Sequence, residues 1–172
     1  MKKLITVFTF LVLQINFAIA NTNVAFIDLD KVLKVSKAGS SILKNLSAVN
    51  NNILKNFKED EKNFKVKETK LIAQKNILSE DEFQLNVNKL KTEINNYNVD
   101  RKKIINDFNK LKIDNTNKFL QKIKILLAKY SDEKSISLIL PKKNLIIGKT
   151  ELDITDEIIK IINADINNFK IK

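Results

Sequence analysis

The chain contains neither cysteine nor histidine, and only two of its 172 residues are glycine, Gly39 and Gly148. Without cysteine and histidine there are no thiol nucleophiles, disulfides, Cys/His zinc sites or Ser-His-Asp triads. Two isolated glycines are too few for a loop that cradles phosphate. Acidic residues alone could form a glycosidase pair or a magnesium site, but they lie beside lysines in helical patterns, which favours a solvated surface. We therefore expect neither an enzyme nor a bound cofactor.

Proline and glycine are both absent from residues 40–130, where apolar residues recur every three or four positions. An average spacing of 3.5 residues is typical of a left-handed coiled coil. In the first half of the stretch, steps of four follow one another and the apolar stripe drifts. The clearest run alternates steps of four and three and comprises Phe83, Val87, Leu90, Ile94, Tyr97, Arg101, Ile104, Phe108 and Leu111.

A helix start signal divides this stretch near its middle. Ser79 followed by Glu82 is a capping-box pattern. We therefore predict two long helices that fold back at residues 77–82 as an antiparallel coiled-coil hairpin, each arm about 60 to 75 Å long. Beyond about Asn115 the apolar stripe widens at residues such as Phe119 and Ile123, which predicts that the second arm ends against the body of the molecule.

Residues 1–20 have the pattern of a secretory signal peptide. Lys2 and Lys3 precede an apolar run, and Ala18 and Ala20 form a small-residue cleavage site,. We predict cleavage after Ala20 and an exported protein. An uncleaved N-terminal anchor is the alternative, although the apolar run is short for a membrane-spanning helix.

Short apolar segments lie on both sides of the hairpin. Residues 24–29 form an almost wholly apolar run, which predicts a strand buried on both faces. Residues 138–140 and 145–147 are two further β-prone runs, and Pro141 and Asn144 favour a turn between them. We therefore predict a C-terminal β-hairpin that supplies the partners of the N-terminal strand.

Two short helices complete the predicted body. Asp30 is expected to cap a helical turn at residues 31–35. Asp153 or Thr155 is expected to cap a last helix, with acidic residues in its first turn that complement the helix dipole. The predicted buried face of this helix consists of Ile154, Ile158, Ile161 and Ile162.

The expected fold class is α+β, with the hairpin of residues 40–130 inserted in a small β-rich body made of residues 21–39 and 131–172. Such a small body is marginal alone because small domains bury little surface. Its apolar strands also have open edges that require pairing or covering. We therefore predict self-association through the sheet. The predicted oligomerisation residues are Val24, Phe26, Ile27, Leu138, Leu140 and Ile146.

The net charge of +11 favours an anionic or acidic partner, such as an acidic protein, lipid headgroups, lipopolysaccharide or nucleic acid. A compositional bias towards Asn, Lys and Ile explains part of the lysine content, and lysine-rich helical faces are usually solvated. Apolar residues off the seam, such as Val66, Ile72 and Val99, could nevertheless contact another chain.

A family resemblance is carried by the opening strand at residues 24–29, the stretch 30–33 after it, the hairpin turn at 78–82 and the Leu-Asp-Ile-Thr-Asp stretch at 152–156. The order of these parts resembles the Skp/OmpH family of periplasmic chaperones over the whole chain. The opening strand and the Asp-Ile-Thr-Asp stretch at 153–156 are its more specific parts. The sequence departs from the family pattern in its Asn-rich arms and in lacking a glycine at residues 135–137.

The resemblance implies a homotrimer in which a small trimerisation body carries three hairpin tentacles around a cavity. It implies an ATP-independent periplasmic holdase that keeps unfolded outer-membrane proteins soluble for membrane insertion. Binding of lipopolysaccharide or anionic lipid is also associated with the family. Clients would then contact basic and off-seam apolar side chains of the arms. The predicted client-binding residues are Lys62, Lys65, Val66, Lys70, Ile72, Lys75, Lys89, Lys91 and Val99.

Two other functions are compatible with the residues. An exported basic coiled-coil protein could tether an anionic surface or partner without holding a client. Nucleic-acid binding is suggested only by the net charge, and the predicted signal peptide opposes it.

Overall fold

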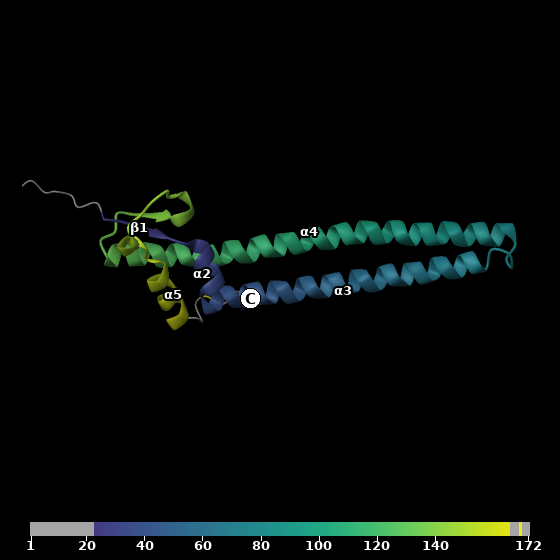
Figure 1. Ribbon diagram of the computed structural model, residues 1–172, viewed down its shortest axis with the longest axis horizontal. Helices are drawn as coiled ribbons and strands as arrows, with labels where there is room; N and C mark the ends of the chain where they lie inside the picture. The colour runs from purple at the N-terminus through teal and green to yellow at the C-terminus, as the bar shows by residue number, and fades with distance from the viewer. Residues whose placement is uncertain (1–22, 166–168, 170–172) are drawn as a thin grey trace, which may run out of the picture.

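The computed structural model describes residues 23–165 and residue 169. It consists of a long two-helix arm and a small body at one end of that arm (Figure 1). The predicted signal peptide, residues 1–20, lies outside the described residues. Within the described ranges, every helix is too short or too polar to span a lipid bilayer.

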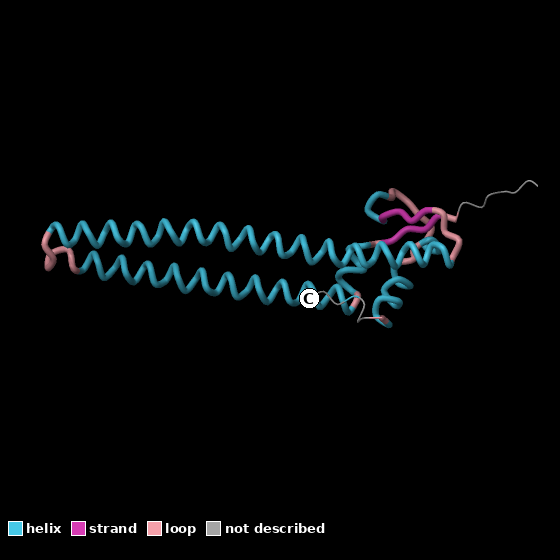
Figure 2. The backbone as a smooth tube through the Cα atoms, turned by 180° about the vertical axis from the view of Figure 1, so that it is seen from behind, coloured by secondary structure: helices cyan, strands magenta, loops and turns pink. Residues whose placement is uncertain are grey.

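The arm is formed by two antiparallel helices, α3 (Lys37–Ala73) and α4 (Glu80–Glu133), joined by residues 74–79 (Figure 2). At a rise of 1.5 Å per residue, α3 is about 55 Å long and α4 about 80 Å. Because α4 has 54 residues and α3 only 37, α4 continues past the start of α3 into the body (Figure 1).

The capping box predicted at the start of α4 is confirmed. The backbone N–H of Glu82 donates to the Ser79 hydroxyl (3.4 Å), and the Glu82 carboxylate accepts from the Ser79 backbone N–H (3.2 Å). The Ser79 hydroxyl also donates to the Glu82 carboxylate (2.8 Å), and this hydrogen bond, followed by the one from the Ser79 N–H, lowers the pKa of Glu82. Two otherwise unpaired donors at the helix start are thereby satisfied, which fixes where the outer turn ends.

The short helix α2 (Leu29–Val35) meets the start of α3 at a close approach. Its N-cap is Asp28, whose carboxylate accepts from the Lys31 N–H (2.8 Å). Asp30 was expected in that role but lies in the first turn, because β1 ends at Ile27, two residues before the end of the apolar run. After α2, a Cβ on Gly39 would overlap the carbonyl oxygen of Leu33. Glycine is therefore required for the two helices to pack this closely.

A two-stranded parallel sheet joins the parts of the chain that flank the arm. β1 (Val24–Ile27) pairs with β2 (Leu138–Pro141), and Phe26 lies opposite Leu140. On the other side of β1, the backbone N–H of Ile154 donates to the Phe26 carbonyl (3.0 Å). The N-terminal strand therefore lies between two segments that follow the arm.

The predicted β-hairpin of residues 138–140 and 145–147 is wrong. Lys142–Asn144 forms the 3-10 turn η1, and residues 145–148 belong to no strand. The inner edge of β2 is taken by β1, and the chain after η1 packs across β1 instead of returning along β2. Gly148 lies so close to Phe26 that a Cβ there would be 2.8 Å from the aromatic ring. A second 3-10 turn, η2 (Thr150–Leu152), follows.

The core lies where the last turns of α4 meet α2, β1 and the C-terminal helix α5 (Thr155–Ala164). The predicted docking of the second arm on the body is thus confirmed. Helix α5 starts one residue after Ile154, so neither Asp153 nor Thr155 is its N-cap residue, although the Asp153 carboxylate accepts from the Thr155 N–H. The largest fully buried side chains are Ile27, Val32, Phe119, Ile123, Ile158 and Ile162.

Candidate functional site

An apolar groove of about 620 Å³ lies between α3 and α4 in the outer part of the arm. Its lining includes Phe64 and Leu71 from α3 and Phe83 and Leu90 from α4. These side chains belong to the apolar stripes by which the two helices pack, but they leave one side of the seam open. An open concavity of this kind can accept apolar side chains of another chain.

Aromatic packing closes the end of the groove nearer the body. The ring of Tyr97 meets Phe57 edge to face at a centroid distance of 6.2 Å and Phe64 at 5.2 Å. The Tyr97 hydroxyl donates to the Glu61 carboxylate (3.4 Å), which also accepts from Arg101 (2.9 Å). Burial raises the pKa of Tyr97, and the charge of Glu61 adds to the rise. These contacts hold the two helices in one register.

A second link between the helices lies farther out, where Lys67 donates to Glu93 at 2.6 Å. The hydrogen bond from Lys67 lowers the pKa of Glu93. Both side chains are partly exposed, so solvent screening leaves this ion pair little net stabilisation. We interpret it as a register contact.

The seam between the helices loosens towards the body. The 3.5-residue spacing places Ile104 and Leu111 in the seam, but they are 40% and 41% exposed. Their expected burial is not observed. On α3 the steps of four from Val49 to Ile53 and Phe57 rotate its apolar stripe relative to a 3.5-residue repeat, and Val49 is itself 39% exposed.

The nine predicted client-binding residues all lie on the outer part of the arm, and the structure brings three of them together. Lys65, Ile72 and Lys91 line the groove, where Ile72 is 64% exposed. The other six are also exposed but lie outside the groove lining: Lys62, Val66, Lys70, Lys75, Lys89 and Val99.

Sequence reasoning missed two exposed apolar side chains near the tip. Ile77, in the turn between the helices, is 80% exposed, and Leu85 is 69% exposed. Leu85 follows the seam residue Phe83 by two positions, which places it off the seam on a helix. That spacing could have identified it. Both add to the apolar surface near the groove.

The predicted oligomerisation residues divide into buried and exposed groups. Phe26 and Ile27 are buried by their own chain, and Val24 and Leu140 are half-buried. Leu138 is 48% exposed and Ile146 is fully exposed. Ile147 and Leu152, which the sequence did not single out, are also exposed. The body therefore presents apolar side chains on β2 and on the segment after η1.

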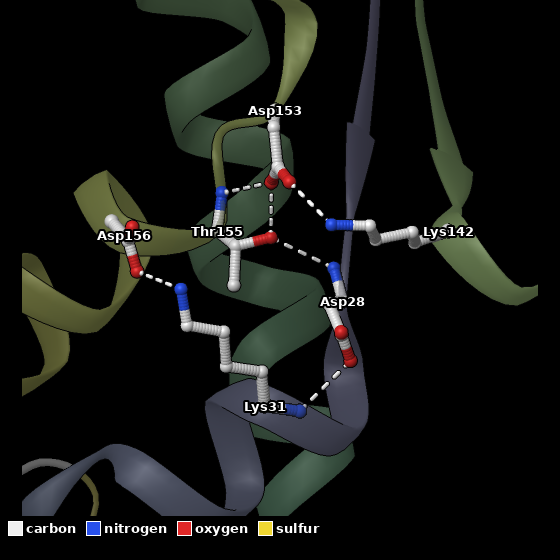
Figure 3. A network of polar contacts seen from close by, with 6 residues as sticks. All are labelled: Asp28, Lys31, Lys142, Asp153, Thr155 and Asp156. Carbon is white, nitrogen blue, oxygen red and sulfur yellow. Dashed lines mark hydrogen bonds and ion pairs between the residues drawn. The ribbon is translucent and has the colours of Figure 1, made fainter. Parts of the chain in front are cut away.

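A polar network joins the two ends of the chain in the body (Figure 3). The Asp153 carboxylate accepts from the Thr155 N–H (3.0 Å), from the Thr155 hydroxyl and from Lys142 (2.9 Å). Burial opposes ionisation of Asp153, but these hydrogen bonds outweigh it and lower its pKa. Asp153 in turn raises the pKa of Lys142. Nearby, Lys31 pairs with Asp156 at 2.6 Å.

A second polar contact anchors the end of α4 on α5. The Tyr130 hydroxyl donates to the Glu157 carboxylate (2.6 Å), and Lys134 lies 3.6 Å from the same side chain. Burial, together with the hydrogen bond to Glu157, raises the pKa of Tyr130 to about 12. The polar groups of both networks bind residues of the same chain. We therefore interpret both networks as contacts that stabilise the body. Among the described residues, no group of three acidic side chains is placed to hold a metal ion.

Comparison with known proteins gives one family and one fold. A family model described as "Outer membrane protein (OmpH-like)" matches residues 23–162. A crystal structure from Caulobacter crescentus CB15, of a protein described as a "putative outer membrane chaperone (OmpH-like)", has a TM-score of 0.71 and 14% sequence identity, with 89% of each chain covered. At this identity the similarity shows a shared fold. No curated protein matches the sequence.

Proposed function

The chain belongs to the OmpH-like family, a family of non-enzymatic chaperones, and from that premise we propose that it is an ATP-independent holdase for unfolded outer-membrane proteins. The family is periplasmic, and the proposal includes export of this chain after cleavage behind Ala20. The observation that carries the proposal is the apolar groove in the outer part of the arm, with exposed apolar side chains around it.

The groove suits a client that has no fixed structure. Strands of outer-membrane barrels alternate apolar and polar side chains, so an unfolded strand can place its apolar side chains along the groove between Phe64 and Leu90. Exposed residues such as Ile72 and Val99 add separate weak contacts. Many weak contacts hold a chain without imposing one geometry, as promiscuous binding requires. Because such weak contacts can break without an energy source, the proposed capture and release of a client need no nucleotide.

We further propose that the body forms a homotrimer. Leu138 and Ile146 are exposed apolar residues, and the outer edge of β2 has no partner within the described residues. An open edge with exposed apolar side chains requires covering. Three bodies joined in this way would hold three arms around one cavity, so that a client meets several grooves at once.

Dilution of a urea-denatured outer-membrane barrel protein tests the holdase. An amount of the mature chain equal to one trimer per client should suppress light scattering without ATP. A tethering protein would bind an anionic surface yet leave the barrel protein to aggregate. Aggregation at that ratio, with the chain shown to be folded by circular dichroism, would reject the holdase function.

Sedimentation tests the trimer independently. Leu138→Asp and Ile146→Asp change exposed residues, so they should lower the trimer fraction while the helix content stays unchanged. Ile125→Asp, at a 73% exposed position on α4, is the matched control. Intact trimers in both body variants would place the interface elsewhere.

A further inference from the structure

The positive charge of the chain is concentrated on the half of the arm next to the body. We define the collar as residues 37–58 of α3 together with residues 101–130 of α4, and the outer half as residues 59–100. The collar carries thirteen basic and two acidic residues, whereas the outer half carries seven basic and nine acidic residues. The charge of the collar therefore equals the net charge of the whole chain, +11.

Little of this collar charge is neutralised within the chain. Its two carboxylates, Asp107 and Asp114, form no ion pair in the described part of the structure. Lys55, Arg101 and Lys129 pair with carboxylates outside the collar, and the pairs of Lys55 and Lys129 are weak i,i+4 contacts at 3.9 and 3.8 Å. The collar thus keeps a strong positive field close to the body.

The collar lysines point in several directions around α4. At 100° per residue, Lys103 and Lys110 share one side of the helix, Lys102 is a quarter turn away, and Lys112 lies near the seam. All four are exposed. A flat surface can contact only one of these sides at a time, whereas a flexible chain can follow all of them.

The tip has the opposite charge pattern. The first turn of α4 carries Glu80, Asp81 and Glu82 in succession. The collar is separated from this turn by about 20 residues of helix, which is about 30 Å. The Debye length at physiological ionic strength is about 8 Å, so this distance spans several Debye lengths. An anionic membrane approached by the tip would therefore meet carboxylates and not the collar.

We propose that the collar captures acidic segments of an unfolded polypeptide, while the groove in the outer half holds apolar side chains. This inference rests on the proposed holdase function and specifies one part of the client. The arrangement separates two tasks along one arm. Long-range attraction acts near the body, and short-range apolar contact acts towards the tip. The lysines of the outer half contribute little net attraction because nine carboxylates surround them.

A pair of matched charge-reversal variants tests the proposal. K102E/K103E/K110E alters the collar, and K62E/K70E/K75E makes the same charge change in the outer half. All six positions are exposed, and Lys and Glu have similar helix propensities. The probe is a fluorescent unstructured 20-residue peptide of Glu, Ser and Gly, with a Gln version as control, measured by anisotropy at low and physiological salt.

The collar variant should bind the acidic peptide at least about fivefold more weakly than the wild type, because three attractive contacts are lost. The outer-half variant should lose less than about twofold. Equal losses in both variants would show that only net charge matters and would overturn the proposal. It would also be overturned if the collar variant lost binding to phosphatidylglycerol vesicles and kept its affinity for the peptide, because the collar would then be a membrane site.

The barrel-protein dilution separates this proposal from the holdase itself. If the wild type leaves the barrel protein to aggregate, the holdase function fails whatever the peptide shows. If the wild type keeps it soluble and the collar variant captures an acid-rich barrel protein at an unchanged rate, the holdase stands and the collar proposal is overturned. A slower capture by the collar variant alone supports both.

Discussion

The hydroxyl of Thr155 accepts a hydrogen bond from the backbone N–H of Asp28 at 2.9 Å, across 127 residues of sequence. Thr155 is 1% exposed and opens α5, while Asp28 follows β1 and caps α2. The same hydroxyl donates to Asp153. One side chain therefore fixes β1, α2 and α5 relative to one another.

Thr155→Val should lower the free energy of unfolding by about 1–3 kcal/mol, because it leaves the Asp28 N–H without an acceptor in a mostly buried place. Urea unfolding at a fixed protein concentration measures the loss. Thr155→Ser keeps the hydroxyl and should recover most of it. Equal losses in the two variants would mean that the methyl group, and not the hydrogen bond, carries the effect.

Acid should weaken the body through Asp153. Its pKa is lowered in the folded chain, so its contribution is present above the unfolded pKa and is lost as pH falls through the folded pKa. The stability difference between the wild type and Asp153→Asn should therefore be constant above about pH 5 and shrink below about pH 4. Urea unfolding of both proteins across this range measures it. A difference that stays constant to pH 3 would contradict the assignment.

Gly39→Ala should destabilise the chain, against the usual trend. Alanine in place of a glycine inside a helix normally raises the free energy of unfolding by about 1 kcal/mol. Here the new Cβ would overlap the Leu33 carbonyl oxygen, and separating two packed helices costs about 1–3 kcal/mol. Thermal unfolding should show a lower midpoint for Gly39→Ala and almost no change for the exposed neighbour Ser41→Ala. A higher midpoint for Gly39→Ala would disprove the close approach.

Ile72→Asp should weaken client capture, because a charge at a groove-lining position removes apolar contact. We expect about a fivefold loss of affinity for an unfolded barrel protein, which corresponds to about 1 kcal/mol. Fluorescence binding measures the affinity. Val35→Asp introduces the same charge at an exposed position outside both the groove and the collar and should have little effect. Equal effects of the two variants would argue against the groove as the site of apolar binding.

The arm could be predicted from the sequence because its features are local. The capping box of Ser79 and Glu82 marks the start of α4. The wider stripe at Phe119 and Ile123 marks where α4 enters the body, and both residues are fully buried there. The groove could not be predicted, because its size depends on the distance between the two helices and not on which residues form the seam.

The body was harder to predict because several local choices are nearly equivalent. Pro141 and Asn144 are good turn residues, yet the apolar run after them does not pair, because Gly148 packs on Phe26 instead. Asp28 and Asp30 are both suitable caps, and only the end of β1 decides between them. Contacts between residues far apart in the sequence decide both whether the apolar run pairs as a strand and which aspartate caps α2.

The pairing of β1 with β2 has a consequence for the order of folding. The two strands are more than 100 residues apart, and contacts of such long range form slowly. Helices α3 and α4 form through contacts between residues that are closer in the sequence. A nascent chain can therefore form its arm before β2 has been synthesised and can pair with β1. A chain that ends prematurely after α4 would then have an arm without a base. Early termination should therefore yield arms that lack the body through which we propose that the trimer forms.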